Sequence, residues 1–484
     1  MAERAFRPYE PDRPLPLPPD LREWLPADHL VYLLSELVDQ LDLTPILAVY
    51  EQGDGGGNPP YHPVLLTKLL LYAYCQGVVS SRAIARKTYE DVAFRVLTAE
   101  QHPDFRTVSD FRERHLPALG DLFVQVVRLA GRLGLVTLEH VAQDGSKILA
   151  NASKHHAMSY GRMQQAEARL SQEIQALLAA ARQADAAEDA AHGPGRTGDE
   201  VPPDLSAEIG RRERRLAAIR AAKAALEAEA RAEAEAVRAA DAAERQRRAA
   251  AGEPKKPGKV PAPQDVPAAQ AQRNFTDPDS RIMKHADHAF VQAYNGQAAV
   301  DASGHQIIVG CLLTNQSADA PHLAPMVAQV QATTGQMPGE WSGDAGFFSA
   351  DNVATVERAG GTAYLPPDRQ AHAAAPLPAP VAQVLATAGL GDPELEPRDE
   401  NAVKAAMRAR LRTAAGRAAY GRRKQTVEPV FGQLKERRGL RRFLLRGLAK
   451  VRGEWTLWCL THNLRKLVQA MRGSAEVPQR LVAT

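Results

Sequence analysis

A run of residues near the C-terminus places one carboxylate within a dense group of cations. The run reads Tyr420-Gly-Arg-Arg-Lys-Gln-Thr-Val-Glu428-Pro-Val-Phe-Gly-Gln-Leu-Lys435. A divalent metal held beside a nucleic-acid phosphate would need both kinds of group, because the acid binds the metal and the cations bind the phosphate backbone. The ordinary alternative for Glu428 is a first-turn acid that the helix dipole favours.

The net charge of the chain is unevenly distributed. The total is only +3, yet residues 401–484 hold twenty Lys or Arg and four Asp or Glu, a local net charge of +16, so the other 400 residues carry −13. This asymmetry favours a nucleic-acid partner for the C-terminal part, and a solvated basic surface is the alternative.

Two further acids stand at the ends of expected strands. Asp144 lies in a strand-like segment at 141–148, and Asp344 follows an expected strand at 339–343. Because the ends of neighbouring strands converge, these acids and Glu428 could hold a pair of Mg²⁺ ions roughly 4 Å apart. Taken singly, Asp144 could mark a turn and Asp344 could cap a helix. No Cys/His cluster indicates zinc, and the three cysteines are expected to be reduced core residues of a cytosolic protein.

The order of elements predicts an α/β layer fold of about five strands. Hairpin strands are expected at 294–301 and 305–314 around a Ser303-Gly304 turn, followed by a helix at 320–333, a helix at 350–359 and a strand at 361–365. Residues 366–400 are expected to be a Pro/Ala-rich loop, and the chain is then mostly helical to about 471. Helix-forming residues at 161–252, broken at 193–204, predict a long antiparallel hairpin that serves assembly or acts as a spacer.

The N-terminal region is expected to be helical. The segments 80–87 and 107–115 open with the N-cap residues Ser80 and Thr107 and carry Arg or His at positions expected to be exposed. They predict either a helix-turn-helix-like DNA reader or an ordinary bundle with surface charges. No signal peptide and no apolar stretch of membrane-spanning length is expected.

The C-terminal run has a geometry suited to a site. Glu428 and Lys435 lie two helical turns apart, and Thr426 as N-cap would tolerate Pro429 in the first turn. The segment 420–424 would then fold back toward the site. An arginine comb suited to phosphates is expected at Arg437, Arg438, Arg441, Arg442 and Arg446.

Motifs along nearly the whole chain resemble those of the DDE transposases of bacterial insertion sequences. The most specific is Thr426-Val-Glu-Pro-Val-Phe-Gly432. The others are Phe6-Arg-Pro-Tyr-Glu-Pro, Tyr61-His-Pro-Val-Leu-Leu, Pro103-Asp-Phe-Arg-Thr-Val-Ser-Asp-Phe-Arg112, Asp144-Gly-Ser-Lys, Asn151-Ala-Ser-Lys154 and Gly343-Asp-Ala-Gly-Phe. The resemblance implies a ribonuclease-H-like mixed sheet flanked by helices, with an N-terminal all-α domain and an inserted long helical hairpin. The expected parts are an N-terminal DNA-binding domain at 1–135, the first catalytic strand at 136–160, the hairpin and linker at 161–272, the rest of the catalytic domain at 273–470 and a tail at 471–484.

The resemblance also implies the site residues. Asp144, Asp344 and Glu428 would be the catalytic triad that binds two Mg²⁺ ions, for which Mn²⁺ can substitute. The family's signature of Tyr, Arg, Glu and Lys fits this sequence, but its Arg-to-Glu gap is one residue longer here, so either Arg423 or Lys424 fills the Arg position. Tyr420 would pack on an end nucleotide. The expected DNA-binding residues are Tyr420, Arg423, Lys424, Lys435, Arg438, Arg441 and Arg442.

The implied reaction is cleavage and joining of DNA. A metal-activated water would hydrolyse a phosphodiester at the element end, and the freed 3′-hydroxyl would attack the target DNA. The expected partners are the terminal inverted repeats, the target DNA and a second copy of the chain, at the nucleoid and away from any membrane. The alternatives are a nuclease that cuts without joining, a catalytically silent DNA-binding relic and a coiled-coil protein. The hairpin is too small a part of the chain to favour the last.

Overall fold

The structure is a computed structural model that describes residues 20–51, 60–192, 203–250, 252, 263–285, 289–368 and 400–473. Residues 1–19, most of the predicted hairpin loop and nearly all of the Pro/Ala-rich loop lie outside these residues. Within them, no helix combines the length and the apolar character of a membrane span. Cys75, Cys311 and Cys459 are buried and unpaired, as expected.

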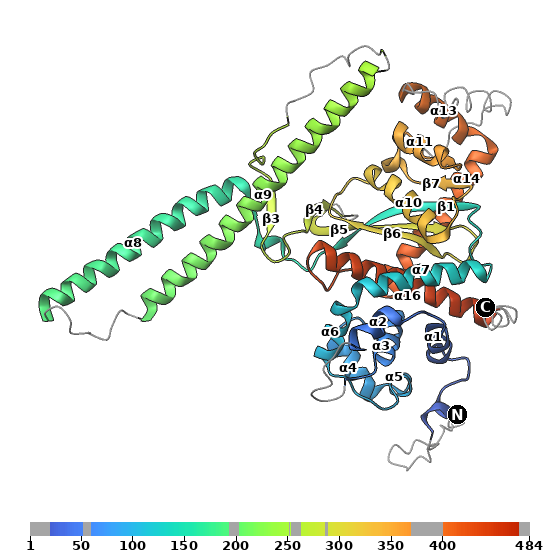
Figure 1. Cartoon of the computed structure of the whole chain (residues 1–484), viewed down its shortest axis with the longest axis horizontal. Coiled ribbons are helices and arrows are strands. Elements are labelled where there is room, and N and C mark those ends of the chain that lie inside the picture. The colour runs from blue at the N-terminus through green and yellow to red at the C-terminus, as the bar shows by residue number, and fades with distance from the viewer. Residues whose placement is uncertain are drawn as a thin grey trace, which may run out of the picture.

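The N-terminal region is a helical bundle below the sheet in Figure 1. Its elements are η1 (Leu21–Trp24), α1 (Leu30–Asp39), α2 (Thr44–Glu51), α3 (Pro63–Cys75), α4 (Ser81–Glu90), α5 (Val92–Leu97), α6 (Phe105–Arg114) and α7 (Leu116–Arg132). The predicted start of α6 at Thr107 is wrong, because Asp104 caps this helix by accepting the amide hydrogens of Arg106 and Thr107.

Two basic residues of the expected DNA-reading helices are not on the surface. Arg112 is buried and donates hydrogen bonds to the Tyr74 hydroxyl and the Val79 carbonyl. His115 is also buried, with its ring stacked on Tyr50. These two residues hold the bundle together, so the prediction that they are exposed is wrong.

A mixed sheet forms the centre of the second region. Its strands are β1 (His140–Leu149), β4 (Arg281–Lys284), β5 (Phe290–Asp301), β6 (Ile308–Thr314), β7 (Glu340–Ser342) and β8 (Thr362–Tyr364). The order is β4-β5-β1-β7-β8, with β6 also paired to β5. β5 runs antiparallel to β1, whereas β7 and β8 continue parallel to β1. This arrangement confirms the predicted ribonuclease-H-like fold, with β4 as a strand that the sequence did not predict.

Helices cover both faces of the sheet, and two glycines show how closely they pack. A Cβ on Gly296 of β5 would lie 3.3 Å from Trp455 on one face, and a Cβ on Gly310 of β6 would lie 2.7 Å from Met326 on the other. The covering elements are η3 (Ala320–His322), α10 (Leu323–Thr334), η4 (Ala345–Phe347), α11 (Ala350–Arg358), α13 (Glu400–Arg412), α14 (Ala414–Thr426), α15 (Glu428–Gly432), the π-helical turn η5 (Gln433–Arg437) and α16 (Leu448–Gly473). α16 also packs against α7 and so joins the two regions.

The C-terminal segment is not continuously helical. Residues 438–447 form a loop, since buried carboxylates accept their amide hydrogens: Glu454 accepts those of Leu444 and Leu445, and Asp277 accepts that of Gly447. The predicted N-cap at Thr426 is also wrong. Thr426 ends α14, its hydroxyl donates to the Arg422 carbonyl, and Val427 precedes α15 instead.

The predicted hairpin is present and projects from the body as a long arm (Figure 1). α8 (Tyr160–His192) pairs with α9 (Pro203–Ala250), and β2 (Ala157–Ser159) pairs with β3 (Gln272–Asn274) at its base; η2 (Lys154–His156) precedes β2. Its buried stripe includes Leu170, Ile174, Leu216, Ile219 and Leu226 and forms a cluster separate from the main core. Leu178 of α8 and Val237 of α9 lie outside this stripe and are exposed.

Replacing residues 162–268 by a short Gly/Ser linker should leave a folded body. The chain ends left by this change already meet, because the amide of Gly161 donates to the Ala269 carbonyl at 3.0 Å. Since the arm buries its own cluster, we expect one cooperative thermal transition close to that of the full chain. Loss of cooperative unfolding would show that the arm belongs to the core.

Candidate active site

The centre of the site is an ion pair between the central strand and a C-terminal helix. Asp144 lies in the middle of β1, and its side chain is 21% exposed. Its Oδ2 accepts a hydrogen bond of 2.9 Å from Nη1 of Arg423, and its Oδ1 accepts the amide hydrogen of Gly145. Arg423 lies in the last turn of α14 and is only 9% exposed, so β1 and α14 meet through buried charges.

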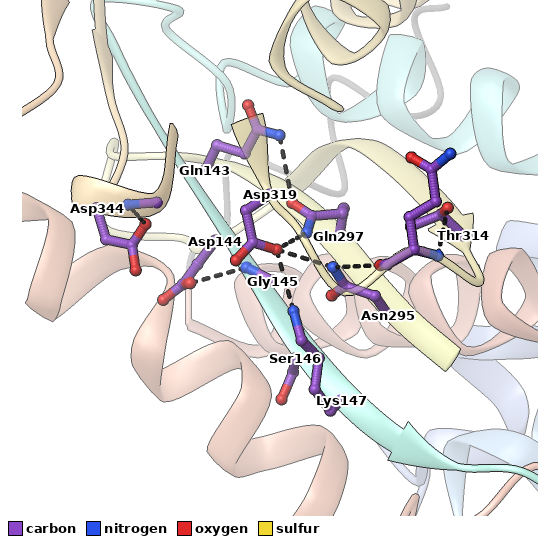
Figure 2. Close-up of polar contacts among 12 residues, drawn as sticks. Gln143, Asp144, Gly145, Ser146, Lys147, Asn295, Gln297, Thr314, Asp319 and Asp344 are labelled. Atoms are coloured by element: carbon purple, nitrogen blue, oxygen red, sulfur yellow. Dashed lines mark hydrogen bonds and ion pairs between the residues drawn. The ribbon is translucent and has the colours of Figure 1, made fainter. Parts of the chain in front are cut away.

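Asp344 lies at the end of β7, beside Asp144. β7 is parallel to β1 with Ala142 paired to Ser342, so the next residues bring Asp344 level with Asp144. Figure 2 shows the two carboxylates directed into the same space on one side of β1. Asp344 also caps η4, because its Oδ1 accepts the amide hydrogen of Gly346 at 2.9 Å.

Glu428 reaches the same place from the first residue of α15. Its Oε1 accepts a hydrogen bond of 3.2 Å from Nη2 of Arg423, and its side chain is half exposed. The guanidinium therefore bridges Glu428 and Asp144, which lie 284 positions apart in the chain. The three acids that the sequence singled out are thus gathered around Arg423.

Burial raises the pKa of Asp144 from 3.8 to about 6, and the nearby charge of Asp344 adds to this effect, although the positive charge of Arg423 opposes it. Burial also works against the charge of Arg423, but the carboxylates of Asp144 and Glu428 more than offset it and raise the pKa of the guanidinium. A carboxyl with a raised pKa beside a second acid is a place where an added cation would bind favourably.

Lys435 closes one side of the site. It lies in η5, and its ammonium group donates to the Ser146 hydroxyl of β1 and, at 3.5 Å, to the Lys147 carbonyl. Burial lowers the pKa of Lys435. Glu428 is connected to β1 through Arg423, and Lys435 through Ser146. Tyr420 lies one turn before Arg423, whose guanidinium carbon is 5.8 Å from the Tyr420 ring centre.

A fourth acid, Asp319, supports the site from the opposite face of β1. Its Oδ1 accepts hydrogen bonds from Lys147 at 3.2 Å, Asn295 at 2.8 Å and Gln297 at 2.7 Å (Figure 2). The alternation of side chains along β1 places Lys147 on the face away from Asp144. A Cβ on Gly346 would lie 3.0 Å from Asp344 Oδ1 and 3.4 Å from Asp319 Oδ2, so these acids flank one backbone position. Sequence reasoning missed Asp319; its place directly between a strand and a helix was the available signal.

The expected arginine comb is not a single surface. Arg438 is buried and donates to the backbone carbonyls of Tyr74 at 2.9 Å and Trp458 at 3.3 Å, so it joins α3 to α16. This corrects its expected contact with DNA, since its charge faces the protein interior. Arg441 is exposed and pairs with Glu436 at 2.6 Å. Arg442 and Lys424 are both exposed.

The side chains suit a hard divalent cation in type, since Asp144, Asp344 and Glu428 offer carboxylate oxygens. Among the described residues, however, no three acidic, His or Cys side chains already stand at ligand distances from one point. Glu428 faces Arg423 instead, and the guanidinium supplies the positive charge between the acids. We infer that a metal would compete with Arg423 for Asp144 and Glu428.

Two family models match the chain. Residues 393–468, which include Arg423, Glu428 and Lys435, match a transposase DDE domain, and residues 19–114 match a transposase domain of the DUF772 family. These two matches support a DDE transposase of insertion-sequence type. As a transposase it is an enzyme that acts on DNA, and its family generally uses a divalent metal. No curated protein and no solved structure gives a significant match to it. Asp144 and Asp344 lie between the matched segments, so geometry alone connects them to Glu428.

The raised pKa of Asp144 predicts a pH-dependent stability of the metal-free transposase. The folded state holds this proton up to about pH 6, whereas the unfolded chain releases it near 3.8, so folding loses roughly 3 kcal/mol as the pH rises through this window. Asp144→Asn lacks the effect. The free energy of unfolding of both proteins is measured with chelator from about pH 4 to about pH 8. The difference between Asp144→Asn and the wild type should shift in favour of the variant as the pH rises, and it should level off above about pH 6. A difference independent of pH would contradict the assignment.

Proposed function

We propose that this transposase cleaves a phosphodiester at the ends of an insertion sequence and joins the freed 3′-hydroxyl to target DNA. The observation that carries the proposal is the convergence of Asp144, Asp344 and Glu428 around Arg423. Three distant segments of the chain supply these acids: the middle of β1, the end of β7 and the start of α15. The transposase-domain matches on either side of the central segment support the same reaction.

Asp144, Asp344 and Glu428 would hold two Mg²⁺ ions, with Mn²⁺ as a substitute. Bound divalent ions supply activation of the attacking oxygen and stabilisation of charge on the phosphate. Arg423 keeps the acids neutralised before substrate binds. Its buried Nε has no hydrogen-bond partner among the described residues, which leaves a donor for a phosphate oxygen. This available donor favours Arg423 over Lys424 for the Arg position of the family signature.

The other proposed DNA contacts surround these acids. Lys435 lies beside Ser146 on β1 and would hold a phosphate next to the cleaved bond, and Tyr420 would pack on an end nucleotide. Lys424, Arg441 and Arg442 are exposed and would contact the backbone farther out. We propose a homodimer at the nucleoid, because two element ends must be brought together, and the projecting arm of α8 and α9 would serve that assembly.

Removal of any one acid should abolish catalysis without abolishing DNA binding. We expect Asp144→Asn, Asp344→Asn and Glu428→Gln each to reduce Mg²⁺-dependent cleavage of a labelled element-end duplex by about a thousandfold or more, because each change removes a ligand. Gel-shift affinity for the same duplex in chelator should persist. Near-normal cleavage by one variant would remove that residue from the triad.

Glu436→Gln is the matched control for Glu428→Gln. Glu436 is exposed in the same segment and pairs with Arg441 rather than with Arg423. It should cleave as the wild type does. The same reactions separate the alternatives, since a nuclease would give cleaved ends without joined products, and a silent relic would bind DNA without cleaving it in any metal.

A further inference from the structure

A basic groove lies where β1 ends, outside the cluster of acids. It has a volume of about 640 Å³ and lies between the segment after β1, the start of β5 and the loop 438–447. We call it the β1-end groove. It is defined by Lys154, His155, His156, Phe290, Arg442 and Arg446.

The charge of the β1-end groove is uncompensated. No Asp or Glu is among the described residues that line it. In the described part of the chain, no ion pair joins Lys154, Arg442 or Arg446 to an acid, and Arg446 donates instead to the backbone carbonyl of Asn151 at 3.0 Å. A concave surface with several cations and no acids attracts phosphate groups.

An exposed aromatic ring shares this groove with the cations. Phe290, the first residue of β5, is 67% exposed. Exposed rings beside cations are the combination that binds unpaired nucleic-acid strands, because a base stacks on the ring while the phosphates meet the charges. A fully paired duplex would leave the ring without a partner.

The walls of the groove are held in place by the protein itself. The amide of Phe443 donates to the Leu149 carbonyl at 2.9 Å, which fixes Arg442 beside the end of β1. The side-chain amide of Asn274 donates to the Ser153 carbonyl at 2.7 Å and anchors the segment that carries Lys154. The groove is therefore preformed, which lowers the entropy lost when a strand binds.

β1 connects the groove to the acids. Leu149 lies five residues after Asp144, about 17 Å along an extended strand, and Lys435 contacts Ser146 between them. A strand bound at Asp144 could thus continue past Lys435 into the groove.

We propose that the β1-end groove binds a single-stranded segment of the DNA substrate, with phosphates on Lys154, Arg442 and Arg446 and a base stacked on Phe290. This proposal rests on the proposed function for the identity of the substrate. It adds a binding site for an unpaired strand that the triad and its neighbouring cations do not require.

The test measures the affinity of the full-length protein, in chelator, for a fluorescent single-stranded oligonucleotide and for a blunt duplex of the same sequence. Phe290→Ala should weaken single-strand binding roughly tenfold and leave duplex binding unchanged. Lys154→Gln with Arg442→Gln should weaken single-strand binding and reduce the slope of log affinity against log salt by about 1.4, since two phosphate contacts are lost.

Two controls match these variants. Ile282→Ala removes another exposed apolar side chain, on β4, and Arg132→Gln removes an exposed cation at the end of α7; neither residue lines the groove. Both should bind the single strand as the wild type does. All of the changed side chains are exposed, so unchanged melting temperatures are expected and exclude misfolding.

Wild-type single-strand affinity in both groove variants would overturn the proposal, as would an equal loss of single-strand and duplex binding in Phe290→Ala. These results are separable from the proposed function, which depends on Mg²⁺-dependent cleavage that Glu428→Gln abolishes. If the wild type cleaves normally but the groove variants bind the single strand as the wild type does, only the groove proposal is overturned. The expected groove effects with no cleavage by the wild type remove only the catalytic proposal.

Discussion

The Arg423 guanidinium balances the charges on which the site depends. Asp144 is largely buried in a central strand beside Asp344, and both the burial and the neighbouring acid disfavour its charged form. Arg423 supplies a cation and ties Glu428 to the same point, so α14 and α15 are held against β1 through charge as well as through apolar packing. Ionisation of these partly buried acids lowers the free energy of unfolding, and a divalent metal could replace the Arg423 guanidinium as the cation that they bind.

The two faces of β1 carry different sets of polar side chains. One face presents Asp144 and Ser146 toward Arg423 and Lys435, and the other presents Lys147 toward Asp319. Gly145 follows Asp144 and lies on the same face of β1 as Lys147. A Cβ on Gly145 would lie 2.2 Å from the Gln297 side chain, so only glycine fits against the polar cluster around Asp319. The same strand then leads from the acids to the β1-end groove, so the proposed cleavage and the proposed strand binding would both take place along β1.

The parts that the sequence predicted correctly are those with a local pattern. β1, the hairpin of β5 and β6, and the arm of α8 and α9 follow from apolar spacing and turn residues. The loop 438–447 could not be predicted in this way, because Glu454 and Asp277 stabilise it from distant positions. Arg438 resembles its exposed neighbours in sequence, and only the packing of α3 against α16 buries it. Asp319 looked like an ordinary residue before a helix, since its partner Lys147 becomes its neighbour only when β1 pairs with β5.

The most direct test of this account is a crystal structure of the transposase soaked with Mn²⁺, examined by anomalous scattering. The account predicts Mn²⁺ bound by Asp144 and Asp344, with Glu428 turned toward the metal and the Arg423 guanidinium displaced from Asp144. Crystals in which Arg423 still bridges Asp144 and Glu428 at saturating Mn²⁺, with no anomalous peak beside these acids, would contradict it.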